Sequence, residues 1–129
     1  MGADLSAGLL GAEMAVVIRW IDRSGLRPWS GLFVGAAAWV LQHQIGSDLV
    51  YWDCRLGTPL LTGGLGLVAA GATVLGGLIS WRARRARPGE GEPGNRAFAG
   101  MVGAATAGIF LLAILFQSLI GFMVPACHA

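Results

Sequence analysis

The chain has 129 residues, of which 55 % are hydrophobic and 12 % are charged, a charged share about half that of an ordinary soluble domain. This length allows one small domain, and its 21 glycines are better tolerated in membrane helices than in soluble ones. The net charge of +2 comes from arginine alone, and eight of the nine arginines lie in residues 19–27 and 82–96. The basic excess therefore indicates membrane topology and gives no support to a nucleic-acid partner.

Residues 4–23 are expected to form an amphipathic helix, the main part of an N-terminal segment 1–28. Leu10 and Met14 share one face of this helix, whereas the charged side chains lie mostly on the other. Glu13, near the centre, would cost about 2.5–3.5 kcal/mol inside a bilayer. We therefore predict an interfacial helix that lies on the membrane, with a fourth span as the alternative.

Three runs without Asp, Glu, Lys or Arg follow, at residues 29–45, 59–81 and 97–124. The last two exceed about 20 residues, the length that crosses roughly 30 Å of hydrocarbon. A soluble chain of this size would have no core large enough to cover such apolar faces. We predict an all-α membrane protein whose domain, residues 29–129, contains three transmembrane helices at about 29–50, 59–81 and 97–124.

The arginines also predict how these helices are oriented. One group lies in residues 82–96, between the second and third spans, and the other lies in residues 19–27, before the first. Loops rich in arginine stay in the cytoplasm. Both groups agree, so loop 51–58 and the C-terminus are expected on the periplasmic side of a bacterial inner membrane.

Small residues recur at four-residue spacing in the predicted spans, a pattern that lets helix backbones approach closely. The alternative is that glycine and alanine are simply frequent here and that such rows arise by chance. The residues predicted to pack between helices are Gly31 and Gly35, then Ala69, Thr73 and Gly77, and finally Gly100, Ala104 and Gly108.

The two cysteines, Cys54 and Cys127, are both expected on the periplasmic side, where disulfides form readily. In the chain-entropy model a disulfide that closes a loop of about 70 residues is worth about 4 kcal/mol. Two alternatives stay open. One is a copper or zinc site that adds His128 and Asp53 to the cysteines, and the other is a pair of free thiols.

A polar cluster interrupts the second half of the first span. It consists of Gln42, His43, Gln44 and Asp48, and Gln117 reaches a similar depth in the third span. Ionisable groups at membrane depth are candidates for function, here contact with a quinone or a partner subunit. The competing interpretation is structural, with hydrogen bonds to Gln117 and Ser118. Haem ligation is disfavoured because it usually needs an axial pair of ligands within one bundle.

Catalytic motifs are missing from the sequence. It contains no phosphate-binding glycine loop, nucleophile elbow or metalloprotease motif, so we do not expect an enzyme. A stand-alone transporter would need polar residues along a path through both leaflets, and the inner halves of the predicted spans have almost none.

Several short motifs together resemble a known family. In chain order they are Trp39-x-x-x-His43, Tyr51-x-x-Cys54, a glycine-rich second span, the arginine loop, Arg96-x-Phe98, Phe116-Gln117-x-x-Ile120 and Pro125-x-Cys127. The pattern is similar to that of small three-helix membrane proteins of bacterial respiratory gene clusters, found beside haem-copper (cytochrome c) oxidase subunits. The resemblance covers most of residues 29–129 and leaves the N-terminal segment outside it.

This resemblance implies a non-catalytic accessory subunit that packs against other membrane subunits of a respiratory complex. Haem and copper would then belong to partner subunits, and this chain alone would bind no cofactor. The alternative function is an assembly or copper-handling factor on the periplasmic face, which would use Cys54, Cys127 and His128 as transient ligands.

Overall fold

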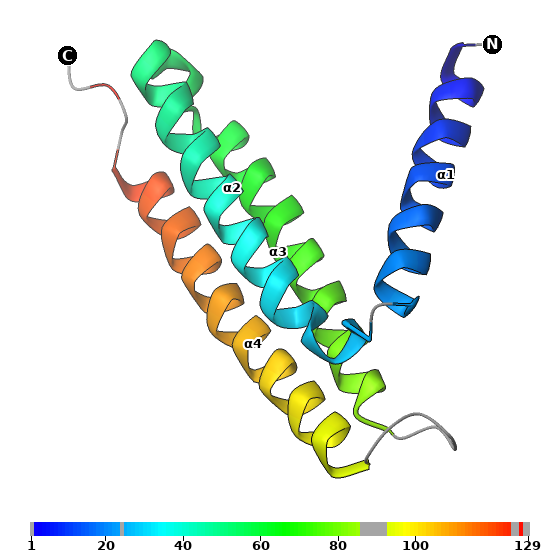
Figure 1. Ribbon diagram of the computed structural model, residues 1–129. Helices are drawn as coiled ribbons and strands as arrows, with labels where there is room; N and C mark the ends of the chain where they lie inside the picture. The colour runs from blue at the N-terminus through cyan, green and yellow to red at the C-terminus, as the bar shows by residue number, and fades with distance from the viewer. Residues whose placement is uncertain (1, 24, 86–92, 125–126, 128–129) are drawn as a thin grey trace.

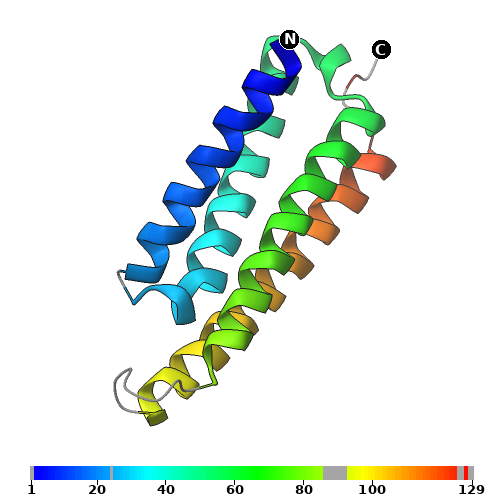
Figure 2. The same cartoon turned by 90° about the vertical axis from the view of Figure 1, so that its right-hand side faces the viewer.

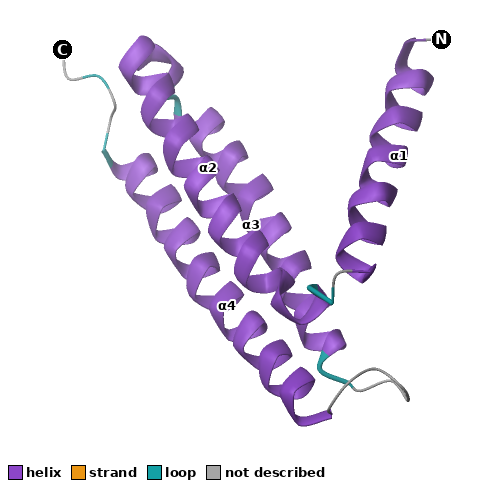
Figure 3. Ribbon diagram, viewed as in Figure 1, coloured by secondary structure: helices purple, strands orange, loops and turns teal. Residues whose placement is uncertain are grey.

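The computed structural model, drawn in Figure 1, describes residues 2–23, 25–85, 93–124 and 127. Within these residues the chain is helical and has no β-strand, so the predicted all-α class is confirmed (Figure 3). The four α-helices are α1 (Gly2–Arg23), α2 (Ser30–Trp52), α3 (Pro59–Ala83) and α4 (Pro93–Met123). Two 3-10 turns, η1 (Arg27–Trp29) and η2 (Cys54–Leu56), precede α2 and α3.

The ends of the helices follow local signals in the sequence. Pro59 lies in the first turn of α3, where a missing N–H does no harm, and Thr58 Oγ1 accepts a hydrogen bond from the N–H of Leu61 at 3.4 Å. Pro93 likewise begins α4, ahead of the predicted limit at residue 97. The prediction stopped there because Arg96 ended the uncharged run, but an arginine in the first turn does not prevent a helix from forming.

Helices α2, α3 and α4 pack side by side into a bundle (Figures 1 and 2). At one end η1, the last turn of α3 and the first turns of α4 come together, and we call this the arginine end. At the other end η2 approaches Cys127, and we call this the disulfide end.

Two helices in the described part of the chain are long and apolar enough to cross a membrane, Pro59–Ala83 and Gly94–Met123. Helix α2 is long enough but is not one of them, because the polar side chains from Gln42 to Asp48 lower its mean hydropathy. In α3 only 22 % of the most apolar stretch is buried in the bundle, and in α4 only 28 %. Neither helix is therefore covered as the core helix of a soluble protein would be.

Helix α1 diverges from the bundle (Figure 1). The turn before η1 contains Gly25, whose φ of 67° lies in the left-handed region that glycine adopts most easily. From there α1 extends back toward the disulfide end, so that its beginning lies at the same end of the molecule as the end of α4 in both views (Figures 1 and 2). This direction differs from the one expected of an interfacial helix, which would lie across the arginine end. The apolar part of α1, Gly8–Val17, is nevertheless shorter than a span.

Small and hydroxylated side chains fill the interior of the bundle. Thr73, Ser80 and Ile114 are fully buried, and Ala69 and Ala107 nearly so. Large apolar side chains lie mostly outside: Leu67 is 76 % exposed, Val68 73 % and Leu75 62 %. The distribution is thus the inverse of that in a soluble helical bundle.

The close approach of the helices depends on glycine. A methyl group at Gly31 of α2 would meet the carbonyl oxygen of Gly103 in α4, and one at Gly103 would meet the carbonyl oxygen of Pro28. A methyl group at Gly100 would lie 2.7 Å from the carbonyl oxygen of Ser80 in α3. Of the residues predicted to pack, Ala69 and Thr73 are buried, and a methyl group at Gly35 or Gly77 would lie 3.0 Å from a neighbouring helix.

Gly108 does not pack against another helix in the described part of this chain, because it is exposed and has nothing within 4 Å of the position a methyl group would take; packing of Gly108 against another chain stays a prediction. A row of residues spaced by four drifts about 40° around a helix at each step, because a turn holds 3.6 residues. The interface of α4 therefore shifts away from the row Gly100, Ala104, Gly108. It continues instead through Gly103 and Ala107.

Two substitutions in α4 test this interface. Gly103→Ala should destabilise the bundle by about 1–3 kcal/mol, because the added methyl group would press on backbone atoms of η1. Gly108→Ala, the matched control, should cause no loss and should stabilise the helix by up to about 1 kcal/mol, because alanine favours a helix more than glycine does. Thermal unfolding in mild detergent, followed by circular dichroism, measures both. Equal losses in the two variants would contradict the packing described here.

Candidate functional site

A buried serine pair joins the helices at the arginine end. Ser80 Oγ of α3 accepts a hydrogen bond from the N–H of Gly31 at 2.7 Å and lies 3.2 Å from Ser30 Oγ. The Ser30 hydroxyl also lies within hydrogen-bond distance of the carbonyl oxygens of Arg27, at 2.8 Å, and Gly76, at 3.0 Å. Both serines are at least 96 % buried, so these bonds satisfy polar groups that water cannot reach. The pair holds the first turn of α2 against α3.

Gln42 forms the inner part of the predicted polar cluster and is 4 % exposed. Its Nε2 donates to Ser118 Oγ of α4 at 3.1 Å, and the Ser118 hydroxyl donates to the carbonyl oxygen of Ile114 at 2.8 Å. Gly66 of α3 leaves room for this contact, since a methyl group there would meet Ser118 Oγ. Gln42 Oε1 is buried and has no hydrogen-bond partner among the described residues.

His43 lies on the exposed side of the same cluster. Its Nδ1 is 3.0 Å from Gln117 Nε2 of α4, and its ring stacks on that of Trp39 with a centroid distance of 5.8 Å. Which of the two atoms donates depends on the tautomer of the His43 ring, and either arrangement joins α2 to α4. The contacts of His43 are therefore those of a residue between two helices.

The two other members of the cluster interact along their own helix. Gln44 Nε2 donates to Asp48 Oδ1 at 3.1 Å, and both side chains are exposed. The predicted hydrogen bonds to Gln117 and Ser118 are thus present for His43 and Gln42. The structural interpretation of the cluster is therefore the one that its contacts support.

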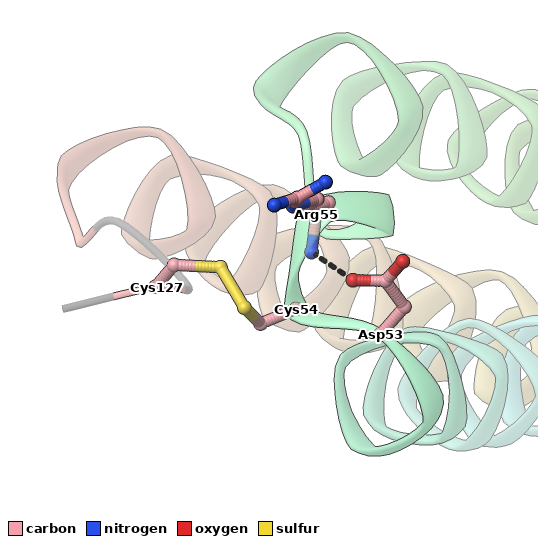
Figure 4. Close-up of a disulfide and its surroundings, with 4 residues drawn as sticks. All are labelled: Asp53, Cys54, Arg55 and Cys127. Carbon is pink, nitrogen blue, oxygen red and sulfur yellow. Dashed lines mark hydrogen bonds between the residues drawn. A yellow bond between two sulfur atoms is a disulfide. The ribbon is translucent and has the colours of Figure 1, made fainter. Parts of the chain in front are cut away.

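Cys54 and Cys127 lie at disulfide distance, with their sulfur atoms 2.04 Å apart and their Cα atoms 5.5 Å apart (Figure 4). The bond joins η2 to the chain beyond α4, as predicted. Beside it the Asp53 carboxylate accepts a hydrogen bond from the backbone N–H of Arg55 at 2.9 Å, which stabilises the turn (Figure 4).

Both sulfur atoms are engaged in the disulfide, so they are not thiolate ligands for a metal in this state. His128, the third predicted ligand, lies outside the described residues. Among the residues that are described, no group of three or more His, Cys, Asp or Glu side chains is arranged to hold a metal ion.

Sequence reasoning missed the partnership of Ser30 with Ser80. Ser80 belongs to a second four-residue row, with Ala72 and Gly76, but Ser30 carried no motif. The one available signal was its place in the first turn of α2, directly after Pro28 and Trp29. A serine at a helix start normally suggests a cap, and here its hydroxyl reaches a neighbouring helix instead.

Two hollows lie along the contact of α3 with α4. One, of about 490 Å³ toward the disulfide end, is lined by apolar residues that include Gly63, Leu115 and Phe122. The other, of about 360 Å³, is lined by residues that include Gly77 and Gly108. The outward-facing part of the small-residue rows therefore borders open space rather than another helix of this chain.

Comparison of the chain with protein-family models, with curated proteins and with solved structures gives no match. The resemblance to small proteins of respiratory gene clusters stays a prediction based on short motifs.

Replacing Ser80 by alanine tests the serine pair. Ser80→Ala removes the acceptor of the Gly31 N–H in a buried place and should destabilise the bundle by about 1–3 kcal/mol. Ser47→Ala is the matched control, because the Ser47 hydroxyl is exposed and bonds only the carbonyl oxygen of His43 in its own helix. Thermal unfolding in detergent compares the two variants. A Ser80 variant as stable as the control would show that the pair contributes nothing.

Proposed function

We propose that this chain is a membrane-embedded, non-catalytic subunit of a larger complex, with α2, α3 and α4 crossing the bilayer. The observation that carries the proposal is the inverted burial of the bundle. Fully buried Thr73 and Ser80 lie inside, whereas Leu67, Val68 and Leu75 lie outside with more than half of each side chain exposed. Full burial of a leucine or valine side chain is favourable by about 1.5–3 kcal/mol, and this free energy is lost where the side chain faces water. Contact with hydrocarbon recovers it.

Helix α2 fits the same environment despite its polar second half. A polar side chain at membrane depth is tolerated when a neighbouring helix supplies its hydrogen bond. Gln42 bonds Ser118 and His43 bonds Gln117, so α4 supplies that bond to two of the four polar residues. Gln44 and Asp48 lie closer to the disulfide end and pair with each other.

The proposed orientation follows from the two ends of the bundle. The arginine end gathers Arg27, Arg82, Arg85 and Arg96, and basic segments stay in the cytoplasm. The disulfide end would then face the periplasm of a bacterial inner membrane, an oxidising compartment in which the Cys54–Cys127 bond would persist.

The role of a subunit is supported by α1. Its large apolar side chains that are described are exposed, with Leu9, Leu10 and Met14 at 64–67 %, and α1 has no extensive interface with α2, α3 or α4 in the described part of the chain. A helix that leaves its own bundle and keeps an apolar face uncovered is suited to packing against helices of another membrane protein.

The specific complex that we propose, one of the haem-copper oxidase type, rests on the motif resemblance. Its haem and copper would be held by partner subunits. A copper-handling factor is the second choice, because it would need both thiols reduced and the structure pairs them in a disulfide.

Purification of the tagged chain from its native membrane in mild detergent tests the proposal. We expect it to elute with larger membrane subunits that show a haem absorption spectrum. The double variant Leu10→Asn, Met14→Asn should elute as the free chain, because it makes the exposed face of α1 polar while leaving the bundle intact.

The control is Leu60→Asn, which changes a leucine at the start of α3 that is even more exposed, at 88 %. It should remain in the complex. Elution of the unaltered chain alone and without haem would reject the proposal. Retention of the α1 variant would reject the role assigned to α1.

A further inference from the structure

We propose that the arginine end contains a binding site for the phosphate groups of an anionic phospholipid. The site is a cavity of about 290 Å³ lined by Arg27, Ile79, Arg82, Ala83, Arg85 and Arg96. This inference rests on the proposed membrane location and names a ligand class that the topology does not require.

The arginines that line the cavity come from three different segments. Arg27 lies in η1, Arg82 and Arg85 come from the end of α3 and the residues that follow it, and Arg96 lies in the first turns of α4. Arg96 Nε donates to the carbonyl oxygen of Ala83 at 3.1 Å, which fixes its guanidinium group beside the last turn of α3. The fold therefore brings together positive charges that lie far apart in the sequence.

The charge and size of the cavity indicate the ligand. Four guanidinium groups line it, those of Arg82 and Arg85 together with those of Arg27 and Arg96, which also have other contacts within the chain. Guanidinium groups bind phosphate oxygens through paired hydrogen bonds. The volume is close to the lower end of ligand pockets, about 300 Å³, which suits a headgroup rather than a whole cofactor. A lipid with two phosphates offers one to Arg82 and one to Arg85, whereas a lipid with a single phosphate must share it between them.

The apolar part of the lining favours a lipid over a free phosphate ion. Ile79 lies about one helical turn from Arg82 toward the middle of α3 and is 41 % exposed. From the cavity the surface of α3 continues through exposed apolar residues such as Leu75. An acyl chain could follow this surface while the headgroup stays with the arginines. Basic pockets between helices on the cytoplasmic side bind such headgroups in other membrane proteins.

The neighbouring Arg84 supplies a control. Its guanidinium carbon lies 3.5 Å from the centroid of the Trp81 ring, a cation–π contact, and it does not line the cavity. Arg84→Gln therefore removes the same charge from the same stretch of chain without changing the site. Arg82→Gln and Arg85→Gln remove charges from the site itself.

Native mass spectrometry of the full chain in detergent tests the site. The probes are cardiolipin, phosphatidylglycerol, phosphatidylcholine and inorganic phosphate, each added separately. We expect retention of cardiolipin, weaker retention of phosphatidylglycerol, and no retention of the other two. Arg82→Gln and Arg85→Gln should each weaken cardiolipin binding about fivefold, and Arg84→Gln should change it less than about twofold.

Circular dichroism confirms that each variant keeps its helices before binding is measured. Equal losses from all three substitutions would mean diffuse charge attraction and would overturn the site. Retention of inorganic phosphate as strong as that of cardiolipin would overturn its assignment to a lipid. Equal binding of phosphatidylcholine would do the same. Each of these three outcomes would reject the lipid site without affecting the proposed function. Recovery of the chain in the soluble fraction of the cell would instead reject the membrane location itself.

Discussion

The near-contact of three backbones at the arginine end is the constraint on which the rest of the bundle depends. Gly31 and Gly103 lie so close that neither has room for a methyl group, and Ser80 fills the remaining space. Helices in hydrocarbon gain nothing from hiding apolar surface, so they associate through close packing and hydrogen bonds between them. In the proposed membrane location, small residues must then face inward. The bulky leucines and valines are left to face outward, as observed.

Polar groups in the bundle also join the helices, through hydrogen bonds. Serine at one end, and glutamine and histidine nearer the other, reach across to a neighbouring helix, so that the two serine hydroxyls and Gln42 Nε2 gain partners, whereas Gln42 Oε1 has none among the described residues. Each bond also fixes the relative height of two helices, which van der Waals packing alone would fix less firmly. The disulfide then ties η2 to the chain beyond α4 and limits separation of the helices at the end with fewer glycine contacts. The described geometry accounts for these residues as structural parts without assigning them a reaction.

Much of this arrangement could be predicted from the sequence. Uncharged runs located α2, α3 and α4 to within a few residues, and the topology argument paired Cys54 with Cys127. Spacing alone could not tell which small residues face inward. The row that begins at Gly100 drifts around α4, so that Gly108 lies outside the interface and Gly103, which is not in that row, lies inside it. The amphipathic pattern of α1 could not predict the direction in which this helix leaves the bundle, because that direction is set by the turn at Gly25. The cavity at the arginine end escaped sequence reasoning because its arginines belong to segments that only the fold brings together.

The central claim is that hydrocarbon, not water, covers the outward leucines of α3. Nitroxide labels at Leu67→Cys and Leu75→Cys, in the chain reconstituted into vesicles, measure this directly through their collisions with dissolved oxygen and with a water-soluble nickel chelate. A membrane span predicts frequent collisions with oxygen, which concentrates in lipid, and few with the chelate. A label at Leu56→Cys in η2, outside the helices, should show the reverse. Rapid relaxation of the labels at residues 67 and 75 by the nickel chelate would contradict the account.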